Sequence, residues 1–393
     1  MTRIASAADW SGSPFTLSQM AASLLIGTVG VTIAGVQPIL YGALHSAGRI
    51  DMAQIGHAAT LELLALGIGV VLGGALMKGT RLRPVTVLAA LLLAAANLAT
   101  LSASGEMVAV VRGLAGLPGG VLLWVMTAAV VRSAKPATMS AAALLTQALV
   151  QSSTAAIVSF VAPGVVAAVP VAIAVLCVVA ILATPALPRA FAPLPKEPTA
   201  SGLPPVRGWL VLGATLLLQA AIVGAWVYME PVGRQAGLND AQIAFATPAS
   251  LAAQIVGGII AMMLAQRLRW FPALMVAVSG LVLLLLGMSR VPAPTIFIMM
   301  EMGFGALWTF SSPFLTPLSI ENDPTRRAAM LGPTAMLVGS GLGPVAASML
   351  VGDDNAILVL RLSALFAGAA MLLIIGLFAT RHRTAEAPAI GIG

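Results

Sequence analysis

The chain has 393 residues, of which 59% are hydrophobic and only 8% are charged. This composition, with its positive mean hydropathy, lies far outside that of water-soluble globular proteins and leaves little room for a soluble domain. The single cysteine, Cys177, cannot close an intramolecular disulfide, and no cysteine or histidine cluster accompanies it. The sequence also shows no nucleophile triad and no phosphate-binding loop. We therefore expect neither an enzyme nor a bound metal or cofactor.

Apolar stretches follow one another along the chain with only short polar turns between them. A helix needs roughly 20 apolar residues to cross about 30 Å of hydrocarbon. The first fifteen residues lack the charge order and cleavage site of a signal peptide, so the first helix is expected to remain as an anchor. The pattern predicts an all-α membrane protein with spans at residues 16–44, 52–77, 84–103, 107–131, 137–161, 165–187, 207–232, 240–264, 271–289, 294–318, 328–351 and 356–380.

The basic residues are distributed unevenly between the two sets of loops. If the N-terminus is inside, fifteen of the 20 lysines and arginines fall in the termini and loops of one side, and three fall in the opposite loops. By the positive-inside rule, both termini are expected in the cytoplasm, with the helices in the inner (plasma) membrane. The formal charge of +7 then reflects membrane topology, and nucleic-acid binding is not expected.

The second half of the sequence repeats the first. Residues 47–55 read AGRIDMAQI and residues 235–243 read QAGLNDAQI, and each stretch leads into an even-numbered span. The pair Leu123–Trp124 recurs as Leu307–Trp308, and a basic triplet at 81–83 recurs at 267–269. Parallel repeats of this kind build two helical bundles related by a pseudo-two-fold axis along the membrane normal. We expect a six-helix bundle at 1–187, a cytoplasmic linker at 188–206 and a second six-helix bundle at 207–393.

The helix count, the linker and the repeat together resemble the major facilitator superfamily, as does the run from Arg112 to Gly120 in the fourth span, an arginine followed by closely spaced glycines. The loop from Gly74 through Arg81 to Arg83 is similar to the family's signature loop, with Lys78 in place of the usual acid. The resemblance implies the major facilitator fold, transport by alternating access, and conformational or gating roles for these loop residues and for Gly339, Gly343 and Pro344. The fifth span lacks the family's antiporter motif, so the direction of transport stays open.

Ionisable residues inside predicted spans are costly and are therefore candidates for function. Glu62 lies in the middle of the second span, on a face with small residues, and we expect it to point into protein, either as a proton-coupling group or as a packing residue. Arg112 and Glu301 lie at similar depth in the fourth and tenth spans, which line the central cavity in the family that the chain resembles. They could face each other, as a substrate-binding arginine with a proton-coupling acid or as a fixed ion pair. In a further alternative, Arg112 only braces its own half through backbone carbonyls. Arg361 is expected to reach outward to the membrane interface, and His57 to lie at that interface.

Polar and aromatic side chains at helical spacing predict a cavity wall. Gln219, Trp226 and Glu230 share one stripe of the seventh span. The wall is expected to bind a small amphipathic molecule, with Glu230 as a further proton-coupling candidate, although tryptophan and methionine also simply fill space. The predicted substrate-binding residues, besides Arg112, are Gln37, Tyr41, Gln219, Trp226, Met300 and Trp308.

The favoured function is a proton-coupled secondary transporter of a small organic molecule, with an organic anion as substrate because of Arg112. The alternative is a drug/proton antiporter that exports lipophilic compounds, which the acids and aromatic residues favour. A membrane receptor or scaffold without transport activity is a weaker alternative. The expected partners are a small-molecule substrate, protons and the lipid bilayer, and the protein is expected to be a monomer.

Overall fold

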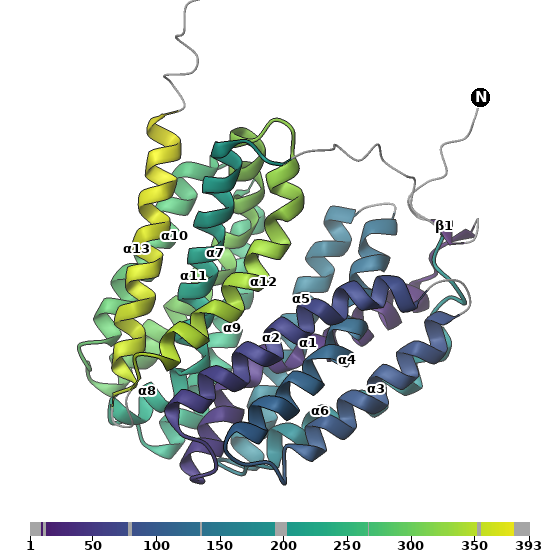
Figure 1. Ribbon diagram of the computed structural model, residues 1–393, viewed down its shortest axis with the longest axis horizontal. Coiled ribbons are helices and arrows are strands. Elements are labelled where there is room, and N and C mark those ends of the chain that lie inside the picture. The colour runs from purple at the N-terminus through teal and green to yellow at the C-terminus, as the bar shows by residue number, and fades with distance from the viewer. Residues whose placement is uncertain are drawn as a thin grey trace, which may run out of the picture.

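The computed structural model describes residues 9–10, 13–77, 81–133, 136–192, 203–265, 267–351 and 355–380. Helices dominate these residues (Figure 1). The twelve long helices are α1 (Leu17–Ser46), α2 (Met52–Leu76), α3 (Leu82–Ala99), α4 (Glu106–Arg132), α5 (Pro136–Val161), α6 (Ala168–Ala183), α7 (Val206–Val227), α9 (Asp240–Leu264), α10 (Trp270–Met288), α11 (Pro294–Asn322), α12 (Arg327–Ser348) and α13 (Ile357–Ala379). The remaining elements are the short helix α8 (Met229–Gln235), the 3-10 turn η2 (Thr184–Ala186) and the two-residue strands β1 (Asp9–Trp10) and β2 (Ser13–Pro14).

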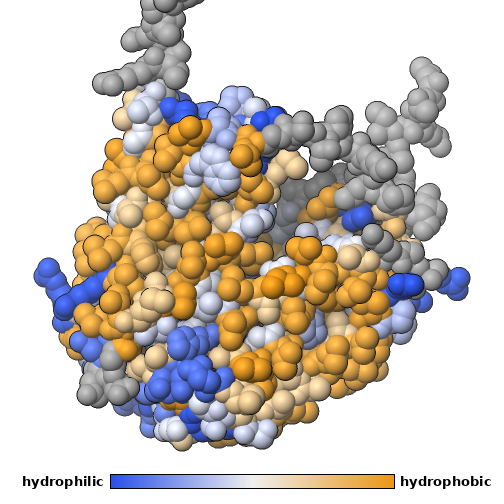
Figure 2. Space-filling view, viewed as in Figure 1, coloured by the Kyte–Doolittle hydropathy of each residue, from blue (hydrophilic) through white to orange (hydrophobic). Residues whose placement is uncertain are grey.

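The chain is a multi-pass membrane protein. Within the described residues, 11 helices are long and apolar enough to cross a membrane. The remaining long helix, α11, is 29 residues long and contains Glu301, Pro313 and Pro317, which lower its hydropathy. Apolar side chains cover the sides of both bundles, and polar ones gather toward the ends (Figure 2).

The helices form two bundles, α1–α6 and α7–α13, whose internal contacts correspond pair by pair. In the first bundle α2 packs on α4, α1 on α5, and α3 on α6. In the second bundle α9 packs on α11, α7 on α12, and α10 on α13. Between the bundles, α2 packs on α12, and α5 packs on α9. Each of these contacts has its counterpart under exchange of the two halves, as the sequence repeat predicts.

The repeated sequence motif forms the same local structure twice. Gly48 and Gly237, which precede α2 and α9, have φ angles of +67° and +84°, a conformation that glycine adopts readily. A capping box then starts each helix: Asp51 and Gln54 begin α2, and Asn239 and Gln242 begin α9. The repeat therefore encodes a sharp turn followed by a fixed helix start.

The bundles meet through the ends of their helices that lie away from the linker. We call this the far side, and we call the side where α6 ends and α7 begins the linker side. Tyr228 donates a hydrogen bond to the backbone oxygen of Met52 at 3.0 Å, and Thr60 donates to the backbone oxygen of Gly341 at 2.8 Å. Toward the linker side, α2 and α12 diverge (Figure 1). The two bundles are thus joined at the far side.

The seventh span was predicted as one helix over residues 207–232, and this prediction is wrong at its end. The helix α7 stops at Val227, and α8 begins at Met229 after Tyr228, whose φ and ψ are −97° and 7°. Pro231 explains the break, because a proline ring clashes with the carbonyl group four residues earlier, here that of Val227. Glu230 therefore belongs to a separate short helix.

Candidate transport site

An ion pair lies inside the first bundle. The carboxylate of Glu62 on α2 pairs with the guanidinium of Arg112 on α4, and both side chains are 0% exposed. Two residues of α1 complete the shell around Glu62. Tyr41 donates its hydroxyl hydrogen to Oε2 of Glu62 at 2.9 Å, and Gln37 donates from Nε2 to the same oxygen at 3.2 Å. The acid is therefore paired and hydrogen-bonded, as a buried charge must be.

The other side of the Arg112 guanidinium faces α3. Its NH1 group donates to Oδ1 of Asn97 at 2.9 Å and to Oγ1 of Thr100 at 3.3 Å. Asn97 and Thr100 are themselves fully buried. Only Nε of Arg112 is left without a partner among the described residues. The network thus joins α1, α2, α3 and α4 within a single bundle.

The expectation that Arg112 faces Glu301 across the central cavity is wrong. The packing of α2 on α4 explains the choice of partner: Gly116, one turn after Arg112, lies directly on the backbone oxygen of Glu62. Because that contact sets α4 against α2, the arginine points into its own bundle. Gln37 and Tyr41 likewise point at Glu62 and not at a cavity between the bundles. Glu62 is buried, as the small-residue face of α2 predicts.

Glu301 lies in the second bundle and lacks the partners that Glu62 has. Its side chain is 1% exposed, and its Oε1 atom has no hydrogen-bond partner among the described residues. Its backbone oxygen accepts a hydrogen bond from Ser250 of α9 at 2.9 Å, which fixes α11 against α9. One turn along α9 from Ser250, the Nε2 group of Gln254 is also buried and unpartnered among these residues. Buried acceptors and donors without hydrogen-bond partners are unusual in a folded protein. Oε1 of Glu301 and Nε2 of Gln254 therefore mark a candidate binding site.

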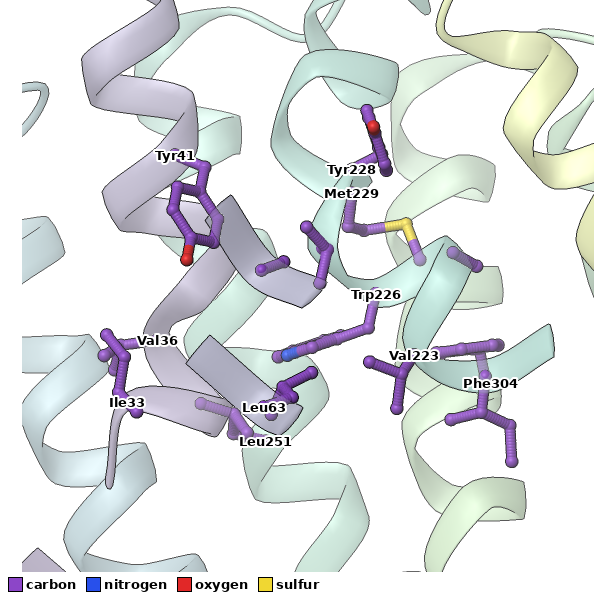
Figure 3. Close-up of a cluster of buried hydrophobic side chains, with 14 of the residues drawn as sticks. Ile33, Val36, Tyr41, Leu63, Val223, Trp226, Tyr228, Met229, Leu251 and Phe304 are labelled. Atoms are coloured by element: carbon purple, nitrogen blue, oxygen red, sulfur yellow. The ribbon is translucent and has the colours of Figure 1, made fainter. Parts of the chain in front are cut away.

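Two tryptophans of the second bundle pack edge to face. The rings of Trp226 on α7 and Trp308 on α11 have centroids 5.9 Å apart and an interplanar angle of 65°. The indole of Trp226 lies in a buried cluster between side chains of the two bundles, including Ile33 of α1 and Leu251 of α9 (Figure 3). Its Nε1 group donates to the backbone oxygen of Ala34 at 2.9 Å. Because Trp308 lies seven residues, about two turns, after Glu301, the two residues share one face of α11.

Glu230, predicted on the same stripe as Trp226, lies instead at the far side on α8. Its Oε1 atom accepts hydrogen bonds from Nε and NH2 of Arg234 at 3.3 and 3.1 Å, and Arg234 also donates to Asp240 at 2.9 Å. The carboxylate packs on Gly42 of α1, where any side chain would overlap it.

The remaining residues predicted for the cavity wall lie in different places. Gln219 is half-buried and contacts α12 at Gly339, so it stays near the interface of α7 and α12. Met300 turns away from the interior and packs on Gly287 of α10, so the structure does not place it in the cavity wall. Trp308 is half-buried beside Trp226.

The predicted gating residues make structural contacts. Gly339 and Gly343 let α12 approach α7, and the backbone oxygen of Pro344 contacts Gly56 of α2, across the bundles. In the loop after α2, Gly74 lies against Trp124, Arg81 is exposed, and Arg83 donates from Nε to the backbone oxygen of Leu187 at 2.9 Å. Lys78 lies outside the described residues.

Two further ionisable residues lie at the surface. Arg361 is exposed, and His57 is half-buried, with Nδ1 3.0 Å from the carboxylate of the exposed residue Glu106. Neither of them joins the buried network or the tryptophan pair.

Sequence reasoning missed four polar residues of the two sites: Asn97, Thr100, Ser250 and Gln254. Asn97, Ser250 and Gln254 are buried in helices that are otherwise rich in apolar residues, and Thr100 is buried directly after the end of α3. A search for isolated amide and hydroxyl side chains within the spans, and not for charges alone, would have found them.

Comparisons with known proteins are informative only for structure. No protein-family model matches the sequence, and no curated protein matches it. Among solved structures, a point mutant of the nucleoside transporter NupG superposes with a TM-score of 0.74 at 14% identity, covering 93% of this chain and 100% of that chain. The unmutated NupG structure gives 0.68 at 13% identity, covering 93% and 99%.

A bacterial homologue of the human lysosomal transporter Spinster, in an inward-facing and unoccupied conformation, gives a TM-score of 0.57 at 12% identity, covering 92% of this chain and 95% of that chain. The chain has the major facilitator fold. At these identities the likeness establishes the architecture, and it confirms the fold that the repeat and the glycine-rich fourth span predict.

Proposed function

We propose that this protein is a secondary active transporter that exchanges protons for a small amphipathic organic cation across the inner membrane. The observation that carries the proposal is the buried carboxyl group of Glu301, which is unpartnered at Oε1 among the described residues and lies on the same face of α11 as Trp308. The major facilitator architecture supports transport in general, since the three similar solved structures are named as transporters.

The charges of the site favour a cation over the organic anion expected from the sequence. That expectation depended on Arg112, whose guanidinium is instead neutralised by Glu62 within the first bundle. The carboxyl group of Glu301 is then the ionisable group on the face of α11 that carries Trp308. A bare carboxylate is costly in a buried site, so the group is stable either when it is protonated or when a cation pairs with it.

Proton and substrate therefore compete for one acid. A carboxyl group that holds a proton cannot also pair with a cation, so binding of one releases the other. The faces of aromatic rings attract organic cations, and Trp226 and Trp308 supply such faces on α7 and α11. This mutual exclusion is sufficient to couple the two fluxes in opposite directions if the site opens to each side in turn.

In the proposed exchange, the proton gradient sets the direction of transport. The distribution of basic residues favours a cytoplasmic location for the linker side, by the positive-inside rule. Because the bundles are joined at the far side, the site in this conformation would exchange substrate with the linker side. Protons entering from outside would then drive export.

A nucleoside is the second candidate substrate. NupG, with a TM-score of 0.74, is named as a nucleoside transporter. A planar base could stack on the tryptophan pair, and Nε2 of Gln254, which lacks a partner among the described residues, could donate a hydrogen bond to it. In this case Glu301 would carry a proton together with the substrate.

The two candidates are separated by transport into liposomes that contain the purified protein. Radiolabelled tetraphenylphosphonium and uridine are offered under an imposed pH gradient with the membrane potential held at zero. The cation proposal expects accumulation of tetraphenylphosphonium in the more acidic compartment, and loss of this accumulation in Glu301→Gln. Glu106→Gln is the matched control, because Glu106 is an exposed acid outside the site.

Three outcomes would decide against parts of the proposal. Uridine accumulation without tetraphenylphosphonium accumulation would favour the nucleoside. Unchanged cation accumulation in Glu301→Gln would remove this residue from the coupling mechanism. A receptor would be favoured if ligands bind but neither probe, and no compound in a wider screen, is transported.

A further inference from the structure

A pocket lies at the far side, where the two bundles meet, and its lining does not include the aromatic pair. Its volume is about 190 Å³, which exceeds that of a protein cavity of about 150 Å³ known to hold benzene. It is lined by Ile39, Ala43, Ser159, Ala162, Pro163, Gly164, Val165, Glu230, Arg234, Asp240, Ile243 and Ala244. The lining thus comes from α1, the end of α5 and the loop after it in one bundle, and from α8 and α9 in the other.

Two nearly buried polar groups of this pocket have free hydrogen-bonding capacity. Glu230 is 6% exposed, and Arg234 bonds only to its Oε1 atom, so Oε2 has no partner among the described residues. Ser159 of α5 is 5% exposed, and its hydroxyl group forms no hydrogen bond within the described part of the chain. One group comes from each bundle. Each group can therefore accept a hydrogen bond from a ligand in the pocket.

The charges and walls of the pocket define the ligand class. Glu230 and Asp240 share the single cation Arg234, so the three groups together carry one excess negative charge. An ammonium group has three donors and no acceptor, which suits one carboxylate oxygen and one hydroxyl oxygen. The walls at Ile39 and Ile243 are aliphatic and suit a short hydrocarbon chain.

We propose that this far-side pocket is a binding site for a small aliphatic ammonium ion, held between Glu230 and Ser159. A ligand in this position touches both bundles on the side where they are joined. It therefore stabilises the conformation that is closed at the far side and slows the opening that transport requires. This site goes beyond the proposed function, because it needs neither Glu301 nor a particular transported substrate.

The experiment is a titration of the purified protein in detergent with n-butylammonium chloride, followed by thermal stability and by calorimetry. The uncharged n-butanol and an equal concentration of sodium chloride are the ligand controls. We expect n-butylammonium to raise the melting temperature in a saturable way, and n-butanol and sodium chloride to leave it unchanged. In Glu230→Gln the affinity should fall at least about tenfold, because hydrogen bonds to a charged acceptor are stronger than those to a neutral one.

Further variants keep the test decisive if Glu230→Gln folds poorly. Ala162→Leu fills the pocket without altering any charge, and it should abolish the response to n-butylammonium. Glu106→Gln should bind the ion as the unaltered protein does. An unaltered response in Ala162→Leu, or an equal response to n-butanol, would overturn the proposal.

The central site also attracts cations, so Glu301→Gln distinguishes the two proposals. Retained n-butylammonium binding in Glu301→Gln, with binding lost in Ala162→Leu, places the ion in the far-side pocket. The reverse pattern would place the ion beside the tryptophans, and it would refute the far-side site while leaving the proposed transport function standing.

Discussion

The buried network of the first bundle gives a quantitative prediction. Arg112→Met leaves the carboxylate of Glu62 without its counter-ion, and Glu62→Gln leaves the Arg112 guanidinium without its counter-ion. Removing one partner of a buried ion pair costs about 3–5 kcal/mol, because a charge remains buried and uncompensated. Both side chains are 0% exposed, so solvent screening does not reduce this cost.

The two single variants should not lose the same amount of stability. After Arg112→Met, Glu62 keeps the hydrogen bonds from Tyr41 and Gln37 and can also take up a proton. A guanidinium cannot lose its charge in a protein, so after Glu62→Gln the arginine stays charged with only neutral partners. We therefore expect Glu62→Gln to be the more destabilising of the two. The double variant should be less destabilised than the sum of the single variants by about 2 kcal/mol or more, within the range measured for coupled neighbours.

The assay is unfolding of the purified protein by increasing mole fractions of a denaturing detergent, followed by tryptophan fluorescence. Arg361→Met is the matched control, because this arginine is exposed on α13, and its change should stay within about 0.5 kcal/mol. If the effects of the two single variants simply add, the ion pair contributes nothing and this description of the network is wrong.

Three further predictions concern packing and the joined far side. Tyr228→Phe removes a hydrogen bond between the bundles that is worth about 0.5–1.5 kcal/mol. The population of molecules opened at the far side should therefore rise several-fold, as measured by distances between spin labels. An unchanged distance distribution would contradict the role of this bond. Gly69→Ala would push a Cβ atom into a backbone carbonyl of α4 and should lower the yield of folded protein. Gly258→Ala is the control and should not lower the yield, because open space surrounds this glycine. Equal yields would contradict the close crossing of α2 and α4. Burial opposes ionisation of Asp323, yet hydrogen bonds from Thr325 and a backbone amide hold its pKa below the usual range. The ionised carboxylate therefore stabilises the fold above about pH 4, and this stabilisation is lost as the pH falls below that value. Asp323→Asn should therefore lower the melting temperature at neutral pH and narrow its difference from the unaltered protein in acid; a constant difference across this range would contradict the prediction.

The spans could be predicted because hydrocarbon selects long apolar helices almost regardless of their neighbours. The errors occur where polar contacts decide the helix ends. The third span was expected to continue to residue 103, but α3 ends at Ala99. Beyond it, the backbone oxygens of Thr100 and Ala103 accept hydrogen bonds from Arg49, which holds them in a turn.

The partner of Arg112 was harder to predict, because the depth of a residue in a helix does not determine the direction in which it points. Glu62 and Glu301 are both buried acids, and depth alone favoured Glu301. The spacing of small residues contained the missing information. Gly116 and Gly120 on α4 lie directly on backbone atoms of α2, as the glycine-rich motif and the small-residue face of α2 together indicate. The position of Glu230 could not be inferred from helical spacing, since Pro231 breaks the helix.

The central claim is that Glu301 binds either a proton or the organic cation. It is tested most directly by proton release when tetraphenylphosphonium binds to the purified protein in weakly buffered detergent near neutral pH. We predict release that saturates toward one proton for each cation bound, its absence in Glu301→Gln, and its persistence in Glu106→Gln. Proton release of the same size in Glu301→Gln, or cation binding without any proton release, would contradict the account.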